Sequence, residues 1–289
     1  MKNTVAFISP ILLTLVMVLV SARGMAQNHN EVSVYISGPF QSLRTDAGSG
    51  GAYHARNGGS LGIGYGYAFS ENWSVLLHAE VQFYSSAISY GQFSDAYETT
   101  DIEGDTFEFR YTFSGYKEKQ KAYFVEIPLM LQYTSPGVNT RFYAAAGVGI
   151  GFSVDATYSA DYSKLSTSGY YSQWDAELQA PKFMGFGNFG KGSVASRDLE
   201  LKNTYMLKLE TGIKQVLNDK NALYLGVYLN YGLNDLSEDK SATASVLTYQ
   251  TDNPSEFDIN TLLYSGNTRS DSKLRAVGFG LKLRYGFSW

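Results

Sequence analysis

Three histidines are the only side chains of this sequence with an unperturbed pKa near neutrality, so they are where acid–base chemistry is looked for first. A surface hydrolase would need such a His beside a nucleophile or an acid. His29 lies near the expected start of the mature chain and His78 lies in a predicted strand, which leaves His54. Ser and Asp are plentiful in the segments around His54, but no catalytic motif surrounds it. The sequence therefore predicts a protein that is not an enzyme.

Clusters of carboxylates offer the next possible chemistry, since oxygen ligands suit Ca²⁺. Asp101, Glu103 and Asp105 form one such cluster, and Asp235, Glu238 and Asp239 form another. Neither follows the full spacing of an EF-hand loop. The glycine pair at 58–59 and the glycine-rich 147–151 lack the Lys-Ser/Thr of a phosphate loop. We expect no metal site and no other cofactor.

A different set of charged residues alternates with apolar residues along predicted strands. Its members are His78, Glu80, Glu126, Lys208, Glu210, Lys214, Lys282 and Arg284. In a small barrel these side chains would face the interior, where a buried charge must be paired. We interpret the set as an ion-pair network that fills the barrel. A gated, narrow ion path is the alternative.

The strands that must position this set are clearest at the end of the chain. From Val277 to Trp289 every second residue is apolar, and the residues between are Gly, Lys, Arg and Ser. This alternation predicts a strand, and an apolar face with aromatic ends is typical of a strand that faces lipid. The pattern recurs at 32–37, 60–69, 73–84, 123–133, 142–153, 206–214 and 223–234. The sequence predicts an all-β fold, an antiparallel transmembrane β-barrel of eight strands.

The segments between these strands alternate in length. Short turns fall at 70–72, 135–140 and 218–220, and long polar segments at about 41–59, 85–120, 155–204 and 235–272. Short periplasmic turns and long external loops are the pattern of outer-membrane barrels. Thr106–Phe113 alternates like a strand inside the second long segment, and we place it above the membrane as a strand extension or loop hairpin. A ten-stranded barrel is the alternative.

The amino terminus and the composition indicate export. Residues 1–26 combine Lys2, an apolar run and the small residues Gly24 and Ala26, which predicts a cleaved secretory signal peptide ahead of a barrel domain at 27–289. The chain has no Cys and a net charge of −4, and it lacks the basic clusters that a nucleic-acid partner requires. A mean hydropathy of −0.19 excludes a multi-helix membrane protein but suits a barrel, half of whose strand residues are polar.

Tyr, Ser and Gly dominate the long segments, a composition found in binding loops. The candidate binding aromatics are Tyr158, Tyr162, Tyr170, Tyr171 and Trp174. Tyr and Trp near strand ends also form interfacial girdles. The composition does not identify an external ligand.

Tyr123–Tyr133, the glycine-rich Phe142–Phe152, the signal peptide and the aromatic end together resemble the small bacterial outer-membrane β-barrel domain family, which is OmpA-barrel-like and includes PorT-like proteins. The resemblance implies a Gram-negative outer membrane as location, and contact with its lipid bilayer and lipopolysaccharide. It also implies insertion by the barrel-assembly machinery, for which Tyr285, Phe287 and Trp289 would be the C-terminal signal. The expected role is non-enzymatic, either structural or surface-binding through the loops. The alternatives are a narrow, porin-like channel for ions or small solutes, and a PorT-like component of a protein secretion assembly.

Overall fold

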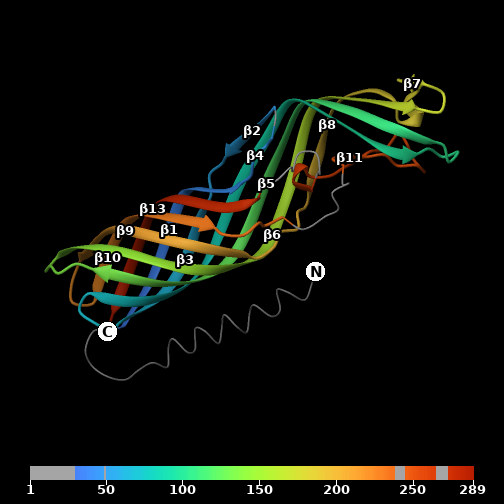
Figure 1. The fold of residues 1–289 in the computed structure, drawn as a ribbon. Helices are drawn as coiled ribbons and strands as arrows, with labels where there is room; N and C mark the ends of the chain where they lie inside the picture. The colour runs from blue at the N-terminus through green and yellow to red at the C-terminus, as the bar shows by residue number, and fades with distance from the viewer. Residues whose placement is uncertain (1–29, 49, 238–244, 265–272) are drawn as a thin grey trace.

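The computed structural model describes residues 30–48, 50–237, 245–264 and 273–289, so the predicted signal peptide lies outside the described residues. Within these ranges eight antiparallel strands form a closed ring (Figure 1). In ring order they are β1 (Asn30–Arg44), β3 (Gly59–Ala68), β4 (Trp73–Thr100), β5 (Thr106–Thr134), β6 (Thr140–Tyr171), β9 (Thr204–Val216), β10 (Asn221–Gly232) and β13 (Arg275–Ser288). The first and last strands pair directly and close the ring. The predicted eight-stranded barrel is confirmed, and the ten-stranded alternative is not adopted.

The alternation of each strand gives the ring two different faces. Outward side chains are large and apolar, and Leu61 and Leu281 stay 64% and 61% exposed. Inward side chains are mostly polar or aromatic and almost fully buried. Glycine makes room for the largest of these, since a Cβ at Gly64 would lie 2.3 Å from the ring of His78. An apolar outside around a polar inside is the reverse of a soluble barrel.

Three strands continue far beyond the ring. β4, β5 and β6 contain 28, 29 and 32 residues, and Figure 1 shows them curving away from the barrel at the end opposite the carboxyl terminus. β2 (Gly51–Ala55) pairs with β4, while β7 (Ala176–Leu178) and β8 (Gly187–Asp198) pair with β6. We call β2, β7, β8 and the upper parts of β4, β5 and β6 the extension. Much of 85–120 and 155–204, expected to be polar loop, is therefore strand, and Thr106–Phe113 is a strand extension as expected.

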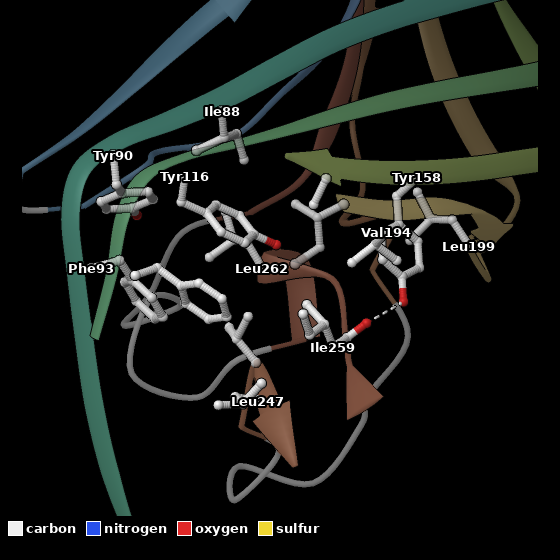
Figure 2. Close-up of a cluster of buried hydrophobic side chains, with 14 of the residues drawn as sticks. Ile88, Tyr90, Phe93, Tyr116, Tyr158, Val194, Leu199, Leu247, Ile259 and Leu262 are labelled. Carbon is white, nitrogen blue, oxygen red and sulfur yellow. Dashed lines mark hydrogen bonds between the residues drawn. The ribbon is translucent and has the colours of Figure 1, made fainter. Parts of the chain in front are cut away.

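The extension has its own apolar core. The inward residues Phe107, Phe109, Tyr111 and Phe113 are at most 2% exposed. The connection between β10 and β13 folds back over them with β11 (Leu247–Thr248), β12 (Asp258–Ile259) and the short 3-10 helix η2 (Leu262–Tyr264). Figure 2 shows Leu247, Ile259 and Leu262 of this connection packed against aromatic side chains of the extension. We call residues 245–262 the cover segment.

The helical content of the described part of the chain is small. η2 and η1 (Lys182–Met184) are single turns. Within the described ranges, no helix has both the length and the apolarity needed to cross a membrane.

Candidate functional site

The centre of the barrel holds a buried cluster of one cation and two carboxylates. Glu80 of β4 and Glu126 of β5 are directly opposite each other in the ladder, where like charges repel. Lys208 of β9 reaches between them, donating to Glu80 and, at 2.7 Å, to Glu126 Oε2. Gln82 donates to both carboxylates, at 2.7 and 2.9 Å, and Tyr84 donates to Glu126 at 3.2 Å. The ammonium group offsets the repulsion, and neutral donors satisfy the remaining oxygens.

A second buried cluster joins β13 to β9. Lys282 Nζ donates to Glu210 Oε2 at 2.8 Å, and the Tyr143 hydroxyl donates to Glu210 Oε1 at 2.8 Å. The Arg284 guanidinium donates to the Gln132 side chain and lies 3.8 Å from the centre of the Tyr224 ring, a cation–π distance.

Two further members of the predicted interior set differ from the rest. Lys214 is only partly buried, at the short-turn end, and bonds Glu31 at 3.2 Å. His78 is buried beside the Tyr35 ring, with centroids 5.0 Å apart, and neither ring nitrogen has a hydrogen-bond partner among the described residues. The structure thus brings Glu80, Glu126 and Lys208 together and Glu210, Lys282 and Arg284 together.

Little space is left among these side chains. The cavity lined by His78, Glu80, Lys208, Glu210 and Lys282 measures about 10 Å³. That is about the volume that a single water molecule needs.

In the extension, Glu118 fixes the cover segment to β5. Its buried carboxyl accepts from the Leu262 amide at 2.8 Å and the Thr261 hydroxyl at 2.5 Å. Gln120 donates to it at 2.8 Å and Tyr116 at 3.2 Å. Burial raises the pKa of Glu118, although these hydrogen bonds oppose the shift.

A second anchor of the cover segment is Tyr97 of β4, whose hydroxyl accepts from the Tyr249 amide at 2.7 Å. Burial raises the pKa of Tyr97 to about 12, so it is a neutral phenol at physiological pH. Tyr111 adds a third anchor through a 2.7 Å bond to Ser245.

The five candidate binding aromatics do not form one surface. Tyr158 and Tyr171 are buried, the former donating to the Ile259 carbonyl at 3.2 Å (Figure 2). Tyr162 packs against the same core, and Tyr170 is half-buried under the Arg110 guanidinium at 4.6 Å. Trp174 is 60% exposed and stacks on Tyr171. A binding role for this set remains a prediction, and exposure favours Trp174 within it.

His54 lies on the outer face of β2, with its Nε2 2.9 Å from the Ser89 hydroxyl. This distance is typical of a His–nucleophile pair. Among the described residues, however, no carboxylate forms a hydrogen bond with the other ring nitrogen of His54, as a catalytic triad would require. The pair is solvent-exposed. Among the described residues, no group of three or more His, Asp or Glu side chains could hold a metal ion.

The predicted C-terminal signal lies on the outward face. Tyr285 and Phe287 are each 43% exposed, and Phe287 stacks on Trp289 with centroids 6.2 Å apart. Its recognition by an assembly machinery remains a prediction.

Two functional residues were not found from the sequence. Glu118 was assigned to a loop, although its alternation with Lys117 and Lys119 continues unbroken into the strand at 123–133. Glu31 precedes the predicted first strand, and only the ring places it beside Lys214. The alternation of residues around Glu118 could have identified it as part of a strand, whereas the role of Glu31 depends on a contact with a residue that is remote in the sequence.

Solved structures similar to this chain include outer-membrane β-barrels, the class of protein that the sequence resembles. The outer membrane protein OprG from Pseudomonas aeruginosa is 13% identical, with a TM-score of 0.40 over 91% of this chain and 97% of its own. The Neisserial surface protein A is 10% identical, with a TM-score of 0.38 over 90% of this chain and 97% of its own. The N-terminal β-barrel domain of P. aeruginosa OprF is 11% identical, with a TM-score of 0.30 over 91% and 100%. No family model and no curated protein matches the chain.

Proposed function

We propose that this chain is a non-enzymatic, integral outer-membrane β-barrel protein whose lumen is filled and whose extension presents a rigid surface for binding outside the cell. The observation that carries the proposal is the combination of an apolar outward band with a charged interior in which Lys208 and Lys282 form ion pairs with buried carboxylates. Either feature alone would be ambiguous.

The dimensions of the band support membrane insertion. On β13 the outward side chains from Phe279 to Phe287 are all apolar and at least 42% exposed. Eight residue steps span about 27 Å along a strand, and a tilt of about 40° reduces this to about 21 Å of height. Membrane barrels carry a band of about 25 Å flanked by aromatic girdles. Aromatic pairs flank the band here, Phe40–Phe279 at one end and Trp73–Tyr133 at the other.

The filled interior favours a role other than conduction. Paired charges occupy the centre, and the cavity beside them measures about 10 Å³. We therefore expect the refolded barrel to be silent in a planar bilayer. Steady single-channel conductance that changes with Glu126→Ala would overturn this part of the proposal in favour of a narrow channel.

The extension supports a binding role because it is a folded platform. Its strands share one apolar core with the cover segment, so its distal end is held in place. Large apolar side chains stand out there, with Ile102 74%, Trp174 60% and Phe183 73% exposed. The Tyr171 hydroxyl donates to Asp101 at 2.9 Å, which ties the β4–β5 turn to the strand that leads to Trp174. Exposed aromatics on a rigid support are typical of binding surfaces.

Adhesion of cells that display the full chain tests the binding role. Cells with the native protein and cells with Trp174→Ala plus Phe183→Ala are compared for attachment to immobilised glycoprotein and polysaccharide surfaces, and for attachment to one another. The double variant should attach several-fold less. Val138→Ala, at an 84% exposed position in a short turn, is the control. Equal attachment of native and double-variant cells would contradict a role for this surface.

A further inference from the structure

A basic pocket lies on the outside of the barrel, next to the upper aromatic girdle. It measures about 580 Å³ and is lined by Arg44, Lys273 and Arg275, together with Asp46, Tyr53 and Tyr231. It lies between β2 and the upper ends of β1, β10 and β13. None of its residues belongs to the buried interior clusters.

The two arginines of the pocket are placed in an unfavourable way for a protein without a ligand. Arg44 and Arg275 are directly opposite each other on the paired strands β1 and β13. Like charges in that position destabilise a sheet. Among the described residues, none of the three pocket cations forms a salt bridge with a carboxylate. An anion bound between the two guanidinium groups would remove this repulsion.

The Arg275 side chain is already held in position to donate hydrogen bonds to such an anion. The Arg275 guanidinium donates to the Tyr231 hydroxyl, and its carbon lies 5.4 Å from the centre of that ring. This contact holds the side chain in place. The Nε of Arg275 is buried and has no hydrogen-bond partner among the described residues. Arginine presents its donors as a planar fork that fits the oxygens of a phosphate.

The height of the pocket points to the source of the phosphate. Arg44 lies four residues beyond Phe40, whose ring stacks on Phe279 at 5.0 Å in the upper girdle. Four steps of a tilted strand correspond to on the order of 10 Å of height. The polar interfacial layer begins at the girdle and is about 5–8 Å thick on each side of a bilayer. An arginine side chain is long enough to bring its guanidinium group from the height of Arg44 down into this interfacial layer.

From these observations we infer that the pocket binds the phosphate group of a phosphorylated glycolipid in the outer leaflet. The inference rests on the proposed insertion of the barrel in an outer membrane. Asp46 is the one carboxylate of the lining, and its Oδ1 accepts from the Gly48 amide at 2.9 Å. The lining therefore presents three cations against one engaged carboxylate.

Native mass spectrometry of the refolded full barrel in detergent tests the inference, with bisphosphorylated lipid A as the probe. The double variant Arg44→Gln plus Arg275→Gln should lower the affinity at least about tenfold, since each charged hydrogen bond lost is worth that much or more. Lys164→Gln plus Lys191→Gln removes two exposed cations of the extension and should leave the affinity unchanged. Dephosphorylated lipid A should bind weakly to all three proteins.

Three further arms separate the possible explanations. Phosphatidylglycerol that binds as tightly as lipid A, with the same loss in the double variant, would overturn the glycolipid assignment in favour of a general phospholipid site. Displacement of lipid A by millimolar inorganic phosphate would support phosphate as the recognised group. Lipid A affinity that is equal in native and double-variant protein would overturn the site altogether.

Folding is measured separately by the heat-dependent electrophoretic mobility of the inserted barrel. A native chain that never inserts into vesicles would refute the proposed function, whereas an inserted barrel without lipid A binding refutes only this site. If the double variant does not fold, Lys273→Gln replaces it, because this side chain is exposed. A several-fold loss of affinity is expected for it, and an unchanged affinity contradicts the inference.

Discussion

Replacing Lys208 by Met should destabilise the barrel more than any other single loss of charge. The Lys208 side chain is 5% exposed and lies against Glu80 and Glu126, which are 4% and 0% exposed. Met has a similar length and no charge. Two buried carboxylates would then be opposite each other across the β4–β5 ladder without a cation.

Removing one partner of a buried ion pair costs about 3–5 kcal/mol of unfolding free energy, because the remaining charge stays buried without compensation. We expect a loss in this range for Lys208→Met, measured by urea titration of the barrel in vesicles, with tryptophan fluorescence and electrophoretic mobility as readouts. Adding Glu126→Gln to Lys208→Met should restore part of the loss, since it removes one of the two like charges.

Lys214→Met is the matched control. Lys214 has 19% of its side chain exposed and, among the described residues, one ion-pair partner, Glu31, at 3.2 Å, so we expect a cost of about 1 kcal/mol or less. A Lys208→Met barrel within about 1 kcal/mol of the native one would refute the interior network as a source of stability. A Lys208→Met plus Glu126→Gln barrel that is less stable than the Lys208→Met barrel would refute it too.

Three other substitutions test separate parts of the account. Gly64→Val should cost about 1–3 kcal/mol, because its Cβ would lie 2.3 Å from the His78 ring. Leu281→Arg should cost about 2–4 kcal/mol if this 61% exposed side chain faces lipid near the midplane. Burial raises the pKa of Glu118, so its contribution to stability is complete below the unfolded value of about 4.3 and is lost as the pH rises toward the folded value. Protection of the cover-segment amides from hydrogen exchange, corrected for intrinsic rates, should therefore fall as the pH rises, and Glu118→Gln should remove that dependence.

Controls for these three are available in the same chain. Gly91→Val should be tolerated, since a Cβ there would have nothing within 4 Å. Leu281→Ala keeps the outward face apolar and should cost little. A Leu281→Arg barrel as stable as the Leu281→Ala barrel would mean that this face does not contact lipid. Protection that rises with pH would mean that folding lowers the pKa of Glu118 instead of raising it.

The barrel could be predicted because the information is local. In β13, for example, Leu281 and Leu283 alternate with Lys282 and Arg284, and a period of two assigns each side chain to a face without reference to the rest of the fold. The partners within the lumen could not be predicted in the same way. The contact of Lys208 with Glu80 depends on the stagger of the strands around the ring, which no single strand specifies.

Thr106–Phe113 was predicted to be a strand extension or loop hairpin, but the core that buries its apolar face was not predicted, because the partner of that face is remote in the sequence. Phe107, Phe109 and Tyr111 alternate with polar residues, as a strand at a surface would. Their burial requires the cover segment, which is more than a hundred residues further along the chain. Apolar alternation in a long loop therefore indicated a second core rather than a set of binding side chains.

The most direct test of a lipid-facing band around a filled barrel uses the absence of Cys from the chain, which makes any introduced thiol unique. Trp174→Cys, Asp219→Cys and Leu281→Cys variants are exposed on intact cells to a membrane-impermeant maleimide. We expect labelling of position 174 on intact cells, of position 219 only after the outer membrane is permeabilised, and of position 281 only in denaturant. Labelling of position 281 on intact cells as fast as position 174 would contradict this expectation.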